Sequence, residues 1–252
     1  MPSDLRRYSS PEGELARFVA QKLIMKPYMW AALNVHVHGK ANLKKLKAPY
    51  IAIANHSSHL DACMVFCALP WRLSKDLAAG AAADYFFTKW YKRIATRLFF
   101  NTYPVERDSS SHKHKGMTRA LLEAGNPIVI FPEGTRSRTG AMGPFNPGSA
   151  AISIQDDIPI LPIALVGDYA AMPYGAFTPV PGRPPVHVVF GRPTKAGPNE
   201  DAVEFSQRLR RYIIELHDAT ARAYQMPTQA DFDRAVALRD AAVPEPGVLP
   251  PY

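Results

Sequence analysis

The chain has 252 residues, of which 47% are hydrophobic, and it carries a formal net charge of +8 at pH 7. This length suits one large α/β domain or two small ones, and the ordinary hydrophobic fraction excludes neither a globular domain nor a peripheral membrane protein. The basic charge favours an anionic partner: a phospholipid surface, a nucleic acid or a phosphorylated substrate. It is concentrated in residues 1–47, where nine Lys or Arg against three acids give +6.

Membrane spans and disulfides are not expected. No run of 18 or more apolar residues is free of charge, so we predict no transmembrane helix. The first apolar segment lies too far from the start, without a cleavage site of small residues after it, to be a signal peptide. Cys63 and Cys67 are four residues apart on one helix face, where the backbone prevents a stable disulfide, which indicates a reducing compartment.

The N-terminal region, residues 1–33, is predicted to be an amphipathic helical segment. Residues 1–14 are polar and are expected to be loose. Apolar residues recur at helical spacing over Leu15–Ala32, and Pro27 predicts either two helices or one kinked helix. Its mixture of aromatic, aliphatic and lysine side chains suits a helix that lies in a membrane interface, but also a helix packed on the main domain.

Buried strands and helices alternate through residues 34–225, which predicts a single α/β domain with a mostly parallel sheet flanked by helices. Residues 226–252 are expected to form a loose or surface-bound tail with one weak helical turn. The expected strands are Asn34–His38, Pro49–Ala54, Leu77–Phe87, Thr102–Val105, Pro127–Phe131, Ile158–Val166 and Val186–Phe190, and the expected helices are Leu60–Leu69, Thr88–Phe100, Ser109–Ala124 and Ala202–Tyr224.

A polar motif, NHSSHLD, follows the buried strand that ends at Ala54. In parallel sheets, functional sites form where strands end at their carboxyl edges. A turn can fold Asp61 back onto His56, so that one ring nitrogen is held and the other is free to take a proton. The pair would act as a general base on a hydroxyl that the substrate brings. Ser57 and Ser58 remain candidate nucleophiles, although neither lies on a G-x-S-x-G elbow.

A second motif, FPEGTRS, follows the strand at residues 127–131. Gly134 allows the backbone to approach a ligand closely, and Arg136 offers a planar fork for phosphate. Glu133 could position Arg136 or accept a hydrogen bond from the substrate. Arg107 follows a third strand end, so the two arginines could bind one phosphate together.

These ordered motifs resemble the blocks of the glycerolipid acyltransferase family. NHSSHLD, Glu106-Arg107, FPEGTRS and Ile160-Leu161-Pro162-Ile163 correspond to its four blocks, over about residues 35–195. The PlsC-like members, the 1-acyl-glycerol-3-phosphate acyltransferases, are the most similar. The second block departs from the family pattern, which commonly has Ile-Asp before the arginine, where this chain has Val105-Glu106. That departure leaves the acceptor open.

The resemblance implies a glycerol-3-phosphate acyltransferase-like fold and transfer of an acyl group to lysophosphatidate, giving phosphatidate. The donor would be acyl-CoA or acyl carrier protein, with no cofactor and no metal, at the cytoplasmic face of an anionic membrane, to which the protein would bind peripherally through its N-terminal helices. His56 and Asp61 would be catalytic. The substrate-binding set would be Asn55, Ser58, Arg107, Glu133, Gly134, Thr135, Arg136 and, near the acyl site, Pro162.

Other functions remain open at this point. Another lysophospholipid or a glycerol-3-phosphate-type acceptor could replace lysophosphatidate. A metal-dependent phosphohydrolase would need further carboxylate or histidine ligands, and His36 with His38 has no carboxylate or Cys nearby in the sequence. A non-catalytic protein that binds anionic lipid explains the charge but not the His–Asp pair. Nucleic-acid binding is not expected, because the basic residues do not interleave with aromatic residues on strands.

Overall fold

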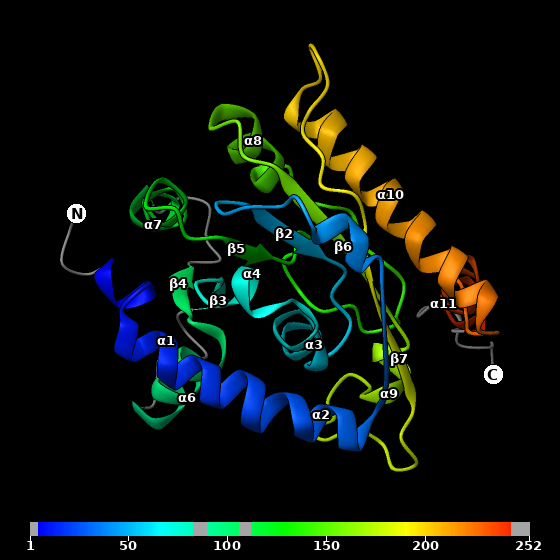
Figure 1. The fold of residues 1–252 in the computed structure, drawn as a ribbon. Helices are drawn as coiled ribbons and strands as arrows, with labels where there is room; N and C mark the ends of the chain where they lie inside the picture. The colour runs from blue at the N-terminus through cyan, green and yellow to red at the C-terminus, as the bar shows by residue number, and fades with distance from the viewer. Residues whose placement is uncertain (1–4, 83–89, 106–111, 243–252) are drawn as a thin grey trace, which may run out of the picture.

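A computed structural model describes residues 5–82, 90–105 and 112–242, and within these ranges it contains one seven-stranded sheet (Figure 1). The strand order is β1-β7-β6-β2-β5-β3-β4, and only the β6–β7 pair is antiparallel. The predicted mostly parallel α/β fold is therefore confirmed. The strands are β1 (Asn34–His38), β2 (Ile51–Ala54), β3 (Ala78–Ala82), β4 (Tyr103–Val105), β5 (Ile128–Ile130), β6 (Ile160–Val166) and β7 (Pro185–Phe190).

The central strand β2 is buried along its whole length, between β5 and β6. Its side chains alternate between the two faces of the sheet. Ala52 and Ala54 join one hydrophobic core with α3 (Leu60–Ala68), while Ile51 and Ile53 join a second core with α10 (Ala202–Ala223). Helices thus cover both faces, as in parallel sheets generally.

The remaining helices divide between these two faces. On the α3 side lie the N-terminal helix (residues 11–32) and three further helices: α4 (Trp71–Ser74), α6 (Trp90–Phe100) and α9 (Asp168–Ala171). On the α10 side lie α7 (His112–Glu123) and α8 (Gly148–Gln155). A short 3₁₀ helix, η3 (Lys40–Leu43), follows β1, where the sequence predicted a basic helix or loop.

The N-terminal region is one continuous helix and not two. It consists of α1 (Pro11–Phe18), the π-helical η2 (Val19–Met25) and α2 (Lys26–Ala32), with helical backbone angles at both junctions. Pro27 has no N–H to donate, and the π-helical stretch directly precedes it, the kind of local adjustment by which helices accommodate proline. None of the helices in the described ranges is both long and apolar enough to cross a membrane.

The start of the chain is more ordered than its polarity suggested. A 3₁₀ helix, η1 (Arg6–Tyr8), comes before α1, and Tyr8 is completely buried. The hydroxyl oxygen of Ser10 accepts a hydrogen bond from the Gly13 N–H at 3.2 Å and caps α1. The expectation that residues 1–14 are loose is therefore wrong for the part that the structure describes.

The expected weak turn after Met226 is a helix of 14 residues, α11 (Gln229–Ala242). Asp231 accepts hydrogen bonds from the backbone N–H and hydroxyl of Thr228, which caps the helix start. The side-chain oxygen of Gln229 accepts a hydrogen bond from the Met142 N–H at 2.7 Å, and the backbone N–H of Gln229 donates to the Asp218 carboxylate at 2.8 Å. These bonds attach the described part of the segment to the domain, which fits the surface-bound alternative; residues 243–252 lie outside the described residues.

Candidate active site

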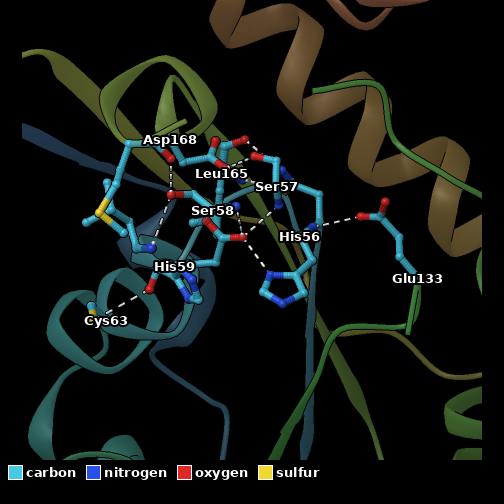
Figure 2. A network of polar contacts seen from close by, with 12 residues as sticks. His56, Ser57, Ser58, His59, Cys63, Glu133, Leu165 and Asp168 are labelled. Atoms are coloured by element: carbon cyan, nitrogen blue, oxygen red, sulfur yellow. Dashed lines mark hydrogen bonds and ion pairs between the residues drawn. The ribbon is translucent and has the colours of Figure 1, made fainter. Parts of the chain in front are cut away.

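Three neighbouring strands deliver polar residues to one edge of the sheet. β2 ends at Ala54 and is followed by Asn55 and His56, β5 leads to Glu133, and β6 leads through Gly167 to Asp168. Because β2 pairs in parallel with both β5 and β6, all three strand ends lie together. Figure 2 shows the resulting network of polar contacts.

His56 and Asp61 form the pair that the sequence predicted. His56 Nδ1 lies 2.7 Å from Asp61 Oδ2, and the Asp61 carboxylate is completely buried. The His56 side chain is 22% exposed, and its ring stacks on Phe131 with 4.2 Å between ring centroids. Nε2 forms no hydrogen bond within the described part of the chain, and the side chain remains partly exposed.

The same oxygen of Asp61 also accepts two backbone hydrogen bonds. The N–H groups of Ser57 and Ser58 donate to Oδ2 at 2.8 and 2.9 Å. Asp61 lies in the first turn of α3, where the helix dipole also favours a negative charge. Three donors on one oxygen fix the carboxylate, and the carboxylate in turn fixes the imidazole.

Burial sets the protonation of this pair. Desolvation lowers the pKa of His56 to about 4, partly opposed by the charge of Glu133, so the imidazole is neutral near pH 7 and can accept a proton. Desolvation also raises the pKa of Asp61 to about 7, although the N–H groups of Ser58 and Ser57 favour its ionised form. A neutral imidazole is the state that a general base requires.

The two sequence motifs are joined through the backbone of His56. Its N–H donates to Glu133 Oε1 at 2.7 Å, and its carbonyl accepts from the Ser137 N–H at 2.7 Å. Glu133 Oε2 accepts from the Gly143 N–H at 2.9 Å. Both carboxylate oxygens of Glu133 therefore hold backbone groups, and neither contacts Arg136 by a hydrogen bond in the described structure.

Asn55 extends the pairing of β2 with β6 by one residue. Its side-chain amide donates to the Leu165 carbonyl at 3.0 Å and accepts from the Leu165 N–H at 2.8 Å, as a strand residue would. Gly134 has a φ of +75°, a conformation that favours glycine, and turns the chain after Glu133. Thr135 follows with an exposed side chain.

Arg136 lies beside the histidines of the first motif. Its guanidinium stacks over the Tyr174 ring at 4.8 Å, and its charge lowers the pKa of His56 and His59. Nη1 is buried and has no hydrogen-bond partner within the described part of the chain. A buried, unpaired guanidinium nitrogen beside a neutral histidine is suited to bind an anionic group.

The other predicted residues are placed differently. Ser58 is buried, and its hydroxyl donates to the Met172 carbonyl at 2.8 Å, while the buried Ser57 hydroxyl donates to Asp168. Neither hydroxyl is therefore available as a nucleophile in this structure. Pro162 lies inside β6 against Gly191, on the face of the sheet that α10 covers. Asp61 belongs to α3, which covers the opposite face of the sheet. Arg107 lies outside the described residues.

Three residues of the site were not predicted from the sequence: Tyr174 against Arg136, the Phe131 ring against His56, and Asp168. Asp168 could have been suspected, because it follows a buried strand as His56 and Glu133 do. The described residues contain no group of three or more His, Cys, Asp or Glu arranged to hold a metal ion.

Comparison with known proteins identifies the family. The family described as Acyltransferase matches residues 34–166, which is more than half of the chain. The chain belongs to the acyltransferase family. The match contains both motifs and the strands β2, β5 and β6, whose ends carry the site.

Among its relatives are two plant proteins named 1-acyl-sn-glycerol-3-phosphate acyltransferase. The protein of Cocos nucifera is 27% identical over 210 residues, and that of Limnanthes douglasii is 30% identical over 156. The alignments cover 82% and 59% of this chain but only 62% and 52% of the relatives. This acyltransferase chain thus spans little more than half the length of these relatives.

A solved structure shares the fold. The 1-acyl-sn-glycerophosphate acyltransferase PlsC from Thermotoga maritima superimposes with a TM-score of 0.61 at 23% sequence identity. The superposition covers 84% of this chain and 85% of that protein. The resemblance read from the sequence motifs is confirmed at the level of family and fold.

Replacing Glu133 with Gln should destabilise the protein. The neutral amide has one acceptor oxygen in place of two, so one of the two backbone N–H groups is left unpaired, at a cost of about 2 kcal/mol in the free energy of unfolding. Urea denaturation monitored by circular dichroism measures this. Glu123→Gln is the control, since the Glu123 side chain is 64% exposed and pairs with Arg119 on the surface. Equal stability of the two variants would contradict the assigned role.

Proposed function

We propose that this protein transfers a fatty acyl group from a thioester, acyl-CoA or acyl carrier protein, to the free hydroxyl of lysophosphatidate. The proposal rests on the hydrogen bond of 2.7 Å between His56 Nδ1 and the buried Asp61 carboxylate, at the edge of the sheet where Glu133 and Arg136 also lie. Family membership and the names of the relatives support the same reaction.

In the proposed reaction, His56 Nε2 takes the proton of the acceptor hydroxyl as its oxygen attacks the thioester carbonyl carbon. A C–O bond forms and the C–S bond breaks. The imidazolium then gives its proton to the departing thiolate, so His56 returns to its neutral state and a free thiol is released. Asp61 stabilises the imidazolium and keeps Nδ1 protonated throughout.

Arg136 is proposed to bind the acceptor phosphate. Its buried Nη1 has no partner in the described structure, and Tyr174 holds the guanidinium plane by a cation–π contact. A phosphate at this position would place the acceptor hydroxyl near His56. Arg107 is proposed as a second phosphate ligand on the basis of the sequence motif alone.

His56→Ala should lower the rate of thiol release from acyl-CoA with lysophosphatidate by about 10²–10⁴-fold, because the general base is lost. Asp61→Asn should also lower it, since the buried carboxylate that stabilises the imidazolium is removed. His59→Ala is the matched control and should retain the rate, because His59 has no carboxylate partner among the described residues. Full activity of the correctly folded His56→Ala protein would exclude the mechanism.

The same assay distinguishes the alternatives. A panel of lysophospholipids and glycerol 3-phosphate, analysed by mass spectrometry, identifies the acceptor. Loss of activity with a chelator would favour a metal-dependent hydrolase. Vesicle binding without turnover of any acceptor would favour a non-catalytic lipid-binding protein.

We also propose that the N-terminal helix docks the protein on an anionic membrane, at its cytoplasmic face. The helix turns polar side chains toward the domain. Arg17 donates to the carbonyls of Tyr8 and Lys75, Gln21 to that of Phe99, and Lys22 to those of Phe66 and Leu69, at 2.8–3.0 Å. These bonds fix the helix to the domain with its other face outward.

The outward face carries an apolar stripe, which consists of Leu15, Val19, Leu23, Ile24 and Tyr28, all exposed. A row of exposed apolar side chains along one helix is typical of a helix that enters a lipid interface. Arg183 donates to the Trp30 carbonyl at 3.1 Å, and so links this helix to the loop that carries Tyr174 and the exposed Phe177.

Leu15→Glu should weaken binding to vesicles that contain anionic phospholipid by about tenfold or more, because burial of one leucine contributes at least that much. Leu238→Glu on α11 is the matched control, since Leu15 and Leu238 are both 66% exposed. Vesicle flotation measures both variants. An equal loss of binding in the two would show that the added charge matters and that the apolar stripe does not.

A further inference from the structure

Asp168 is a buried carboxyl group that the reaction described above does not use. It is the first residue of α9, directly after β6, and is 2% exposed. Gly167 before it has a φ of +85°, and a Cβ there would come within 2.4 Å of the Pro185 carbonyl oxygen. Only glycine fits this turn, which directs Asp168 back toward the end of β2 (Figure 2).

Asp168 is linked to Asp61 and to the loop that carries His56 in two ways. The hydroxyl of Ser57 donates a hydrogen bond to its Oδ2. The backbone N–H of the same Ser57 donates to Asp61 Oδ2 at 2.8 Å, so Ser57 bridges the two buried carboxyl groups, and the pKa of each carboxyl group is affected by the other. Asp61 Oδ2 already accepts from three donors, whereas Oδ1 is buried and receives no ordinary donor from the described part of the chain.

Asp61 and Asp168 are both buried and both accept hydrogen bonds from Ser57. Two ionised carboxylates placed in this way, shielded from water, would repel each other, so this arrangement favours one proton held between them. Asp61 is the more favourable site for the negative charge of the pair. One of its oxygens accepts three hydrogen bonds, and it lies in the first turn of α3, where the helix dipole stabilises an anion. Asp168 accepts only the Ser57 hydroxyl in the described structure, so it is the better site for the proton.

We propose that Asp168 is protonated in the working protein and donates its O–H to Asp61 Oδ1, acting as a positioning residue for the His56–Asp61 pair. The catalytic part of this inference rests on the proposed acyl transfer, but the shared proton does not. The shared proton occupies the oxygen of Asp61 that no other donor reaches. It holds the carboxylate plane so that the other oxygen faces His56.

The surrounding charges agree with this assignment. The titratable groups that act on Asp168 are Asp61 from α3, His217 from α10, and His56 and Glu133 from the loops after β2 and β5. Burial first, and then the charge of Asp61, raise the pKa of Asp168 to about 7. Both effects favour retention of one proton by the pair.

Asp168→Asn and Asp168→Ala together test the proposal. Asparagine can donate its amide N–H to Asp61 and still accept from Ser57, so this variant should keep the rate within about threefold of wild type. Alanine removes both contacts and allows Asp61 to shift, which should cost about 10²-fold in kcat with a smaller change in KM. Equal losses in the two variants would overturn the positioning role.

A second readout needs no activity. Because the pKa of Asp168 is raised on folding, its protonation stabilises the fold below about pH 4, and this contribution is lost as the pH rises through about 7. The Tm of Asp168→Asn relative to wild type should therefore increase between pH 5 and pH 8.5. Asp240→Asn, with a side chain 66% exposed, should run parallel to wild type.

Parallel Tm curves for wild type and Asp168→Asn would overturn the shared proton, whatever the activity. An inactive wild-type protein in which the Tm difference still grows with pH would refute the proposed acyl transfer but support the shared proton. The two failures are therefore distinguishable.

Discussion

The buried carboxylate of Asp61 is the point on which the arrangement of the site depends. One oxygen accepts the Nδ1–H of His56 and two backbone N–H groups, at 2.7–2.9 Å, and no water-exposed surface remains on the side chain. An unpaired buried carboxylate would be very costly, so these donors must be present whenever the domain is folded. Burial therefore enforces the geometry of His56, and the same burial keeps its imidazole neutral.

The sheet makes this burial achievable. β2 is the central strand, and its parallel neighbours end at the same edge, so three separate segments of sequence supply the partners of one loop. Glu133 and Ser137 hold the backbone of His56 from one side, and Asn55 ties the loop to β6 on the other. Each motif contributes hydrogen bonds that the other needs, which explains why two polar segments about 75 residues apart act as one site.

The sequence predicted whatever depends on local pattern. Strand positions, the single mostly parallel sheet and the meeting of His56 with Asp61 all followed from apolar runs and from the spacing of one motif. Roles that depend on long-range packing were not accessible. Glu133 was expected to position Arg136 or to bind the substrate, and the two backbone N–H groups that its carboxylate holds could not be foreseen from the motif. Asp168 gains its importance only because β6 lies beside β2. The helix α11 was missed because its apolar pattern is weak and its cap and the bonds of Gln229 secure it.

The protonation state of the His56 imidazole, on which the proposed reaction depends, can be measured directly. Nitrogen-15 NMR of the labelled protein, with His56 assigned by its absence in His56→Gln, reports which ring nitrogen carries the proton. General-base action requires a neutral ring at pH 7 with the proton on Nδ1 and none on Nε2. A ring protonated on Nε2 alone, or an imidazolium at pH 7, would contradict it, because neither form could take a proton from the acceptor.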